Sequence, residues 1–357
     1  MKYKALGLAL ALCASSTLAD EIETITVYGS TVVEDFSQPQ DDFTFAEIVM
    51  PTAAFTPGGY GGFAGFAERG TQAVHTAVYR NGVPGNDAGS GWYDFGHDIA
   101  TGNESVKVVS GANSVLYGSG SLGGTVFVND DITEGGVVRL GEEHELVSVS
   151  LSDVLNITYF DVNNSSVRTD NTENDHYTNL TGRLVTEYNK FTLAANYTDY
   201  SYDYDQCFNS SFTMINDCVQ EGSKGAVSVR SDRLTLGYSF NQAEFFSAGD
   251  STWDSDAERF FFDAREHQNI NNLPVHLVYG ITSNIERYAG EGQEEYSVYA
   301  VAQIQDIVEL GFRVSDDAVV YRAGIEYNGF FANYGTSYRN PTIYERIGDA
   351  FVLSNPE

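Results

Sequence analysis

Apolar and polar side chains alternate with a period of two from about residue 145 onward. Within residues 233–240, Leu234, Leu236, Tyr238 and Phe240 share one face, and smaller or polar residues share the other. Successive side chains of a β-strand point to opposite faces of its sheet, whereas helices repeat every 3.6 residues. The region therefore predicts a long series of amphipathic strands.

The same alternation returns in segments of about ten residues, separated by turns. The clearest case is a hairpin over 319–338, in which Asn328-Gly329 supplies a type I′ turn. Ten or eleven such segments can be recognised. Further examples cover residues 177–188, 191–202, 273–283, 294–304 and 307–314.

Two architectures accommodate this many amphipathic strands: a large soluble β-sandwich or propeller, and an outer-membrane barrel. In a membrane barrel one face meets lipid and the other a polar lumen, with aromatic girdles at both interfaces. The chain carries 23 Tyr and 22 Phe, and the faces opposite its apolar residues are small or polar. This composition favours an antiparallel transmembrane β-barrel.

The N-terminus is typical of an exported protein. Lys2 and Lys4 precede a short apolar run at 5–13, and Ala19 ends a small-residue cleavage site. We therefore expect a signal peptide over residues 1–19. No later apolar stretch is long enough for a transmembrane helix.

The charge balance argues against one class of partner. Asp and Glu number 50 against 19 Lys and Arg, which gives a formal net charge of −31. Nucleic-acid binding depends on neutralising phosphates with basic side chains, so we expect no nucleic-acid partner. An acidic exterior fits a solvated surface, calcium-binding loops, or a cationic or metal-bearing ligand, and the sequence does not choose among them.

Cys207 and Cys218 lie in a polar stretch between β-like segments. In an exported protein this spacing favours a disulfide that closes a loop and contributes about 3 kcal/mol. The six histidines are scattered, so no metal site and no cofactor are predicted. Nothing resembles a nucleophile elbow or a paired acid and base, so we expect no enzyme.

Residues 31–140 differ from the rest in being rich in glycine and loops, with short strands expected at 77–79, 106–109 and 125–128. Residues 118–123 form a literal G-x-G-x-x-G. A dinucleotide site needs a strand before the glycines and a helix after them, and here a helical turn precedes them and a strand follows. The glycines are therefore interpreted as a turn in a compact mixed domain.

Several motifs, in this order, resemble those of the TonB-dependent receptor family. "ETITVYGS" at 23–30 resembles the TonB box, and the segment that starts at Arg69 resembles a plug strand and its turn. "VKVVSGANSVLYGSGSLGGTVFV" at 106–128 is similar to the plug signature, and 334–357 to a mid-barrel pattern.

The resemblance implies a mostly β fold, in which a mixed α/β plug precedes an antiparallel transmembrane barrel. The expected divisions are a TonB box at 20–30, a plug at 31–140 and a partial barrel at 141–357. Family barrels have 22 strands, so the chain is interpreted as truncated, with a smaller closed barrel as the alternative. The glycines become structural residues of the plug, together with their neighbours: Arg69, Gly70, Tyr117, Gly118, Gly123 and Gly124.

The resemblance also implies active uptake of a scarce bulky ligand, such as a ferric siderophore, cobalamin or a similar metal chelate. The expected partners are outer-membrane lipid, the ligand, and TonB with its inner-membrane energising complex. Strand addition would join TonB to the box at Glu23, Thr24, Ile25, Thr26 and Val27. Glycine-rich loops at 55–66 and 85–97 offer aromatic groups for the ligand, namely Tyr60, Phe63, Trp92 and Tyr93.

Two positions depart from the family pattern. Ser110 stands where the plug signature has Arg, and Asn81 where it has Asp, so docking of the plug on the barrel is expected to be looser or differently paired. Three other readings stay open: a passive porin, a secreted soluble β-rich ligand-binding protein, and a non-functional receptor fragment.

Overall fold

The computed structural model describes residues 33–36, 61–67, 71–165, 174–209, 211–270, 273–305, 307–328 and 330–347. The expected signal peptide and TonB box lie outside these residues, as do Tyr60, Arg69 and Gly70. In the described part of the chain, no helix is both long and apolar enough to cross a membrane.

A five-stranded sheet forms the centre of an N-terminal module, which we define as the described residues up to 130. Its strand order is β1-β4-β5-β2-β3, and only β2 and β5 pair in parallel. Valines alternate into its core, where Val78, Val106, Val126 and Val128 are buried with Phe95. The elements are β1 (Val33–Phe36), a 3-10 turn (Ala73–His75), β2 (Thr76–Arg80), β3 (Val83–Pro84), β4 (Glu104–Ser110), α3 (Ser114–Tyr117) and β5 (Gly124–Asp130).

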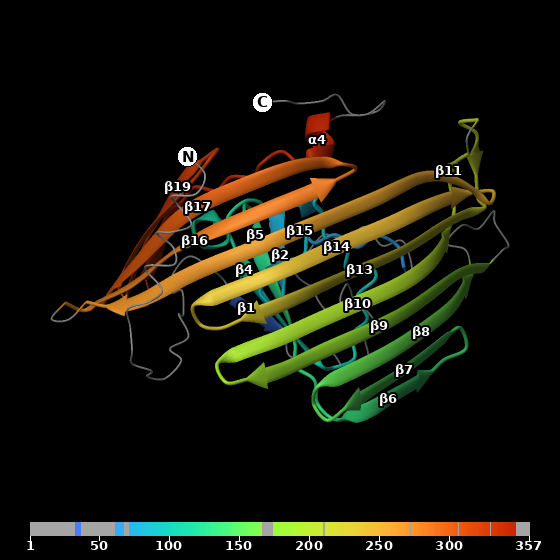
Figure 1. Ribbon diagram of the computed structural model, residues 1–357, viewed down its shortest axis with the longest axis horizontal. Coiled ribbons are helices and arrows are strands. Elements are labelled where there is room, and N and C mark those ends of the chain that lie inside the picture. Colours follow the sequence, from blue (N-terminus) through green and yellow to red (C-terminus); the bar gives the residue numbers. More distant parts are fainter. Residues whose placement is uncertain are drawn as a thin grey trace.

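Thirteen antiparallel strands form a second sheet, the wall sheet, and each pairs with its neighbours along the chain (Figure 1). Every neighbouring pair is antiparallel, as the period-two segments predict. The strands are β6 (Gly135–Leu140), β7 (His144–Leu151), β8 (Leu155–Ser165), β9 (Asn174–Tyr188), β10 (Phe191–Tyr204), β13 (Cys218–Arg230), β14 (Leu234–Ser247), β15 (Asp250–Asn269), β16 (Val275–Tyr288), β17 (Glu291–Ile304), β18 (Val308–Ser315), β19 (Val319–Tyr327) and β20 (Phe330–Gly335).

The wall sheet begins before the predicted boundary at residue 141, because β6 pairs with β7 along its whole length. It also contains more strands than the ten or eleven recognised in the sequence. Strand β6 escaped recognition because it starts with two glycines and alternates over only Val137–Leu140. Strands β6 and β20 are the two edges of the described sheet, so the smaller closed barrel is not formed.

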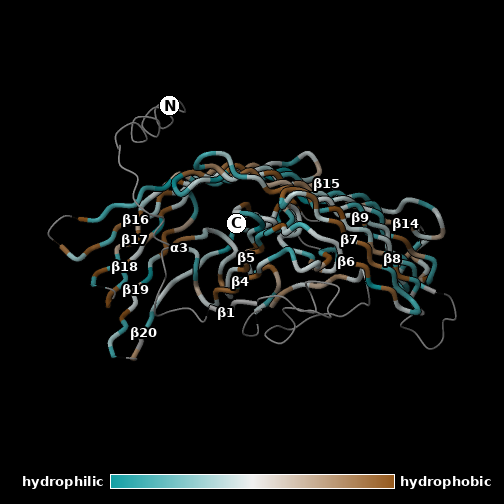
Figure 2. The backbone as a smooth tube through the Cα atoms, turned by 90° about the horizontal axis from the view of Figure 1, so that it is seen from below, coloured by the Kyte–Doolittle hydropathy of each residue, from teal (hydrophilic) through white to brown (hydrophobic). Residues whose placement is uncertain are grey.

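The two faces of the wall sheet have opposite chemistry. On β18, Glu309 and Arg313 are buried, whereas Leu310 and Phe312 are about half exposed. The tube in Figure 2 shows this alternation of hydrophilic and hydrophobic residues along the wall strands. Other exposed apolar residues of the outer face are Val147, Val149, Ile157, Tyr159, Leu236, Phe260, Tyr296, Val298, Tyr321 and Ile325.

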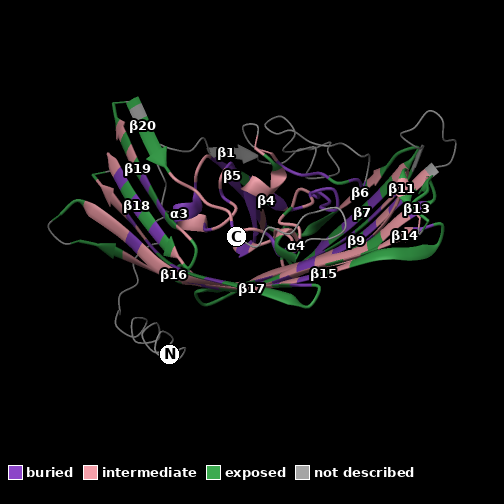
Figure 3. Cartoon of the chain, turned by 90° about the horizontal axis from the view of Figure 1, so that it is seen from above, coloured by how far each residue is buried: buried purple, intermediate pink, exposed green. Residues whose placement is uncertain are grey.

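The wall sheet curves around the N-terminal module, which lies on its concave side (Figure 3). Buried polar residues of the wall therefore face the module: Ser148, Ser150, Thr158, Thr181, Arg183, Thr235, Ser239, Ser297 and Arg313. The predicted fold class, a mixed N-terminal domain followed by an antiparallel barrel wall, is confirmed by this arrangement.

Two small elements lie at the ends of wall strands. Between β10 and β13, strands β11 (Cys207–Phe208) and β12 (Met214–Ile215) form a hairpin, which a disulfide joins through Cys207 and Cys218. After β20 the chain leaves the wall and ends its described part in the short helix α4 (Ile343–Ile347).

Candidate functional site

The glycine-rich turn after α3 forms hydrogen bonds with the segment that follows β20. Gly118 and Gly120 have φ values of 70° and 86°, which side chains rarely allow. The amide of Gly120 donates to the carbonyl of Tyr338 at 3.1 Å, and the amide of Asn340 donates to Ser119 Oγ at 2.9 Å. Helix α3 precedes the turn and strand β5 follows it, which is the reverse of the order in a dinucleotide-binding loop.

The segment 336–342 thus connects wall and module. Ser337 Oγ donates to the carbonyl of Ser121 at 3.1 Å, and Asn340 Nδ2 donates to Glu295 Oε2 at 2.9 Å. Arg313 of β18 reaches from the wall to the end of α3, where its Nε donates to the carbonyl of Val115 at 2.9 Å. Gly123 leaves little room for a side chain, because a Cβ there would lie 2.5 Å from Thr71 Oγ1.

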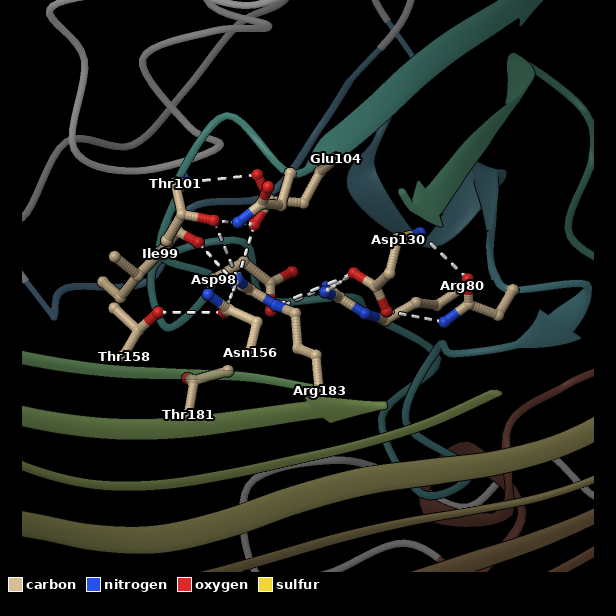
Figure 4. A network of polar contacts seen from close by, with 12 residues as sticks. Arg80, Asp98, Ile99, Thr101, Glu104, Asp130, Asn156, Thr158, Thr181 and Arg183 are labelled. Carbon is tan, nitrogen blue, oxygen red and sulfur yellow. Dashed lines mark hydrogen bonds and ion pairs between the residues drawn. The ribbon is translucent and has the colours of Figure 1, made fainter. Parts of the chain in front are cut away.

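A buried ionic network joins the two parts of the molecule (Figure 4). Arg183 of β9 extends from the wall into the module, where its Nη1 lies 2.5 Å from Glu104 Oε1 and its Nη2 donates to the carbonyl of Ile99. Arg80 of β2 contacts Asp130 at 2.7 Å. These side chains are almost fully buried, and buried charges of this kind are stable only as pairs.

Asn81, one of the positions that depart from the family pattern, belongs to this network. The Asn81 amide donates to Asp130 Oδ2 at 2.6 Å, and its side-chain oxygen accepts from the amide of Asp130 at 3.0 Å. Ser228 of β13 donates to the carbonyl of Asn81 at 3.0 Å. Ser110 is buried at the end of β4. Of the charged side chains of the wall, Arg183, Lys224 and Arg313 all reach the module.

Lys224 supplies a second contact between wall and module. Its Nζ lies 3.0 Å from Asp98 Oδ1, donates to the carbonyl of Asp94 at 2.8 Å, and lies 4.9 Å from the centroid of the Tyr93 ring. Burial alone would raise the pKa of Asp98, but Lys224 and Arg80 hold it below its usual value. Asp98 is therefore an anion that neutralises two buried cations.

The side chains of His97 and Asp94 lie at the same contact between module and wall, and the pKa of each is shifted from its usual value. The His97 ring stacks on Tyr200 of β10 at 3.6 Å between centroids, and burial, with Lys224, lowers its pKa well below the usual value. Burial raises the pKa of Asp94 to about 6. Because a neutral imidazole carries no charge, His97 acts here as a packing residue.

The outward loops present one exposed aromatic pair. Phe63 and Trp92 are 36% and 47% exposed, and their ring centroids lie 5.2 Å apart. Tyr93 differs from the sequence-based expectation of a ligand contact. It is buried, its ring lies tilted against that of Phe95 at 4.6 Å between centroids, and its hydroxyl donates to Asp98 at 2.6 Å, so its ring is not available to a ligand in this structure.

A cavity of about 840 Å³ lies between the module and the wall. All six inward residues of β15 from Arg259 to Asn269 line it, which corresponds to a length of about 33 Å at 3.3 Å per residue. The cavity therefore runs along the strands and is long and narrow. Segment 339–342 lines the same cavity near the exposed aromatic loop.

Sequence reasoning placed Arg313 on the polar face of its strand but assigned no role to it, and it passed over Arg183, Lys224 and Glu104. The available signal was a charged residue on the small or polar face of an amphipathic strand. What the sequence lacked was the partner, because Arg183 and Glu104 are 79 positions apart. No group of three or more metal-ligating side chains occurs among the residues that the structure describes.

Comparisons with known proteins point to one family. Residues 18–125 match the TonB-dependent Receptor Plug Domain. Over 85 residues the chain is 34% identical to the "Vitamin B12 transporter BtuB" of Photobacterium profundum, a match that covers 23% of this chain and 14% of the relative. The corresponding protein of Vibrio vulnificus is 28% identical over 113 residues, or 30% of this chain and 18% of the relative.

Solved structures share the fold. The ferric enterobactin receptor of Pseudomonas aeruginosa superposes with a TM-score of 0.62 at 11% identity, over 90% of this chain and 64% of the receptor. The siderophore receptor PirA of Acinetobacter baumannii gives a TM-score of 0.58 at 13% identity, over 88% and 62%. The chain thus spans less than two thirds of the length of these proteins.

Proposed function

Since this chain belongs to the TonB-dependent receptors, we propose that it acts in the uptake of a bulky ligand across the Gram-negative outer membrane. One observation carries the proposal: a compact module is held by buried charges on the concave, polar side of a sheet whose apolar side chains point outward. A passive porin needs no such module.

The outer face of the wall sheet supports a membrane location. Three tyrosines on this face donate to a carboxylate nearer the same rim: Tyr159 to Asp161 at 2.8 Å, Tyr238 to Glu258 at 3.0 Å, and Tyr296 to Glu294 at 2.9 Å. Tyrosines at a bilayer interface keep the ring in the apolar layer and the hydroxyl in water. We infer that this rim, which also carries the disulfide-closed hairpin, faces the cell exterior.

Cell fractionation tests the location. Expressed in a Gram-negative host, the chain should enter the outer-membrane fraction and require detergent for extraction. Recovery in the aqueous periplasmic or secreted fraction would favour the soluble ligand-binding protein instead.

We further propose that Glu23–Val27 is the TonB box and that TonB adds to it as a strand. Main-chain hydrogen bonds provide the affinity in strand addition, and proline removes a donor and disfavours pairing. Ile25→Pro should therefore abolish capture of TonB in a pull-down, whereas Ile25→Val, which keeps a β-branched side chain, should retain it. Equal capture by both variants would contradict the assignment.

Phe63 and Trp92 are the proposed contacts for the ligand on the exterior side. Cyanocobalamin and ferric enterobactin are suitable probes, because relatives and structural neighbours are named for them. If one of them binds the detergent-solubilised chain, Trp92→Ala should weaken binding about tenfold through loss of ring contact. Phe212→Ala is the matched control, since Phe212 is also exposed but lies on the disulfide-closed loop. An equal effect of both variants would remove Trp92 from the site.

A further inference from the structure

Four aromatic rings gather in the cavity between the N-terminal module and the wall sheet. Tyr79, Tyr117 and Phe127 come from β2, α3 and β5 of the module, and Phe261 comes from β15 of the wall. The ring centroids of Tyr79 lie 5.7 Å from Phe127 and 6.1 Å from Phe261, and those of Tyr117 and Phe127 lie 5.0 Å apart. All four line the cavity, with Tyr79 buried to 8% exposure and the other three half-buried, so they give the cavity an apolar patch.

An ion pair on the same strand as Phe261 has its cation toward the cavity. In the ion pair of Arg265 and Asp263, the arginine side chain is 35% exposed and the aspartate 4%. Asp263 also accepts from the Tyr299 hydroxyl at 3.0 Å, which fixes it in the wall. The guanidinium group is thus the member of the pair that meets the cavity.

The other arginines of the lining differ in exposure: in the pair of Arg259 and Glu286, the arginine side chain is 7% exposed and the glutamate 14%. The carboxylate of Glu295 is 8% exposed and accepts from Tyr338 and Asn340, whereas Arg233 and Arg339 have side chains 46% and 22% exposed. In a chain with 50 acidic and 19 basic residues, arginines outnumber acidic residues in this lining. The arginines are Arg230, Arg233, Arg259, Arg265, Arg313 and Arg339, and the acidic residues are Asp87, Asp232, Asp263, Glu286 and Glu295.

We propose that this cavity is a second, internal ligand site, which binds a planar aromatic anion. The cavity offers aromatic rings and guanidinium groups side by side, which suits an aryl carboxylate or a phenolate. The ring of such a ligand can stack on the aromatic side chains while its anionic oxygen accepts hydrogen bonds from arginine. The volume of about 840 Å³ lies in the range of small-molecule sites. Its elongated shape admits a flat group more readily than a globular one.

This inference rests on the proposed function, since it gives the ligand a place to bind beyond the exterior pair Phe63 and Trp92. The cavity extends along β15 from Arg259 to Asn269, so a ligand group bound at Phe261 would lie between module and wall. Binding there is an equilibrium property and requires neither TonB nor an energised membrane.

Salicylate is the probe, because it carries one ring and one carboxylate. We expect the full chain in detergent micelles to bind salicylate saturably in calorimetry, and to bind benzyl alcohol and acetate at least about tenfold more weakly, since each lacks one of the two groups. Salicylate binding no tighter than benzyl alcohol binding, or no binding at all, would overturn the proposal.

Matched variants locate the site. Phe261→Leu keeps an apolar side chain of similar volume and should raise the Kd for salicylate about fivefold, and Arg265→Gln should raise it about tenfold. Phe260→Leu and Arg287→Gln are the controls, since both residues lie outside the cavity lining and Phe260 is on the opposite face of the same strand. An unchanged Kd in both cavity variants would refute the assignment.

Thiol labelling gives a second measurement that does not depend on ligand affinity. A cysteine at Phe261→Cys should react faster with an anionic methanethiosulfonate than with a cationic one, and salicylate should slow the reaction. At Ser251→Cys, on an exposed acidic part of β15, the cationic reagent should react faster. The same charge preference at both positions would contradict the internal site. A positive result without uptake in cells would leave the internal site standing and count against the proposed transport alone.

Discussion

The N-terminal module and the wall sheet are both built from β-strands, yet they bury opposite residues. In the module, five valines of β2, β4 and β5 are buried to 1% exposure or less and form a dry core: Val78, Val106, Val108, Val126 and Val128. In the wall, many threonines, serines and arginines are buried and many leucines, valines and tyrosines are exposed, although an apolar cluster that includes Leu146, Val162 and Tyr177 is buried against the module. The module buries its apolar residues, as water-soluble proteins do, whereas the wall exposes apolar residues on its outer face.

The difference shows that a residue on the surface of the chain is not always exposed to water. The outer face of the wall is exposed only with respect to water, and its apolar residues are stable where lipid replaces water. The inner face is polar because it meets the polar outside of the module. Substitutions that act differently on the two regions can therefore test the comparison.

The largest effect is expected where the two regions are joined. Arg183→Met removes the cation that Glu104 and Asp130 share, and breaking a buried pair in this way costs about 3–5 kcal/mol. We expect the module to become sensitive to limited proteolysis and to unfold at lower urea concentration. Arg233→Met, at an exposed pair with Glu266, should cost at most about 1 kcal/mol. Equal protease resistance in the two variants would mean that the network does not hold the module.

A charged residue introduced on the outer face of the wall tests whether that face meets lipid. Val298→Arg should reduce the stability of the wall sheet in lipid vesicles by about 2–4 kcal/mol if the site lies near the bilayer midplane. The measurement is refolding into vesicles across a denaturant series, with Val298→Leu as the control. If arginine proves as stable as leucine, this face meets water and the comparison fails.

Alanine substitutions at two glycines compare the tight packing of the module with the more open packing of the wall. A Cβ on Gly96 would lie 2.1 Å from the carbonyl oxygen of Gly62, whereas a Cβ on Gly182 of β9 has nothing within 4 Å. Gly96→Ala must displace the backbone and should cost about 1–3 kcal/mol, while Gly182→Ala should stay within about 0.5 kcal/mol. Thermal unfolding of both variants measures the difference, and similar shifts would show that the Gly96 loop can relax.

The smallest effect concerns pH at the contact between module and wall. The folded state lowers the pKa of His97, so below about pH 6.5 the unfolded chain takes up a proton that the folded chain refuses. Stability should therefore fall on acidification, with a slope of up to about 1.4 kcal/mol per pH unit, and His97→Phe should remove this slope.

The Asp94 carboxyl changes the stability in the opposite direction as the pH falls. Its contribution must therefore be removed from that measurement. Its folded pKa of about 6 lies above the usual value of 3.8, so the folded state binds the proton more tightly and gains stability as the pH falls through 6. The His97 slope should thus be measured in an Asp94→Asn background between pH 7 and 5. An identical slope with histidine and phenylalanine would mean that residue 97 does not titrate there.

Alternation alone predicted most wall strands, because a strand with two chemically different faces has a period that few other structures share. It missed β6, whose glycines interrupt the pattern. The glycine turn at 118–123 was correctly separated from a nucleotide loop, because the elements on either side of it stand in the wrong order. Tyr93 was misjudged, since an aromatic residue between glycines looks the same in sequence whether its ring points to water or into a core.

By itself, the sequence determined that the chain makes amphipathic strands after a glycine-rich module, and its motifs resemble those of the TonB-dependent receptors. Periodicity and turn chemistry are local properties, so they can be read without knowing what lies nearby in space. Only the tertiary structure decided that Arg183 and Lys224 join the two parts, that segment 336–342 folds back onto the glycine turn, and that Phe261 shares a cavity with rings from the module. Those contacts connect residues 79 to more than 200 positions apart, and such partners become neighbours only when the sheet curves around the module.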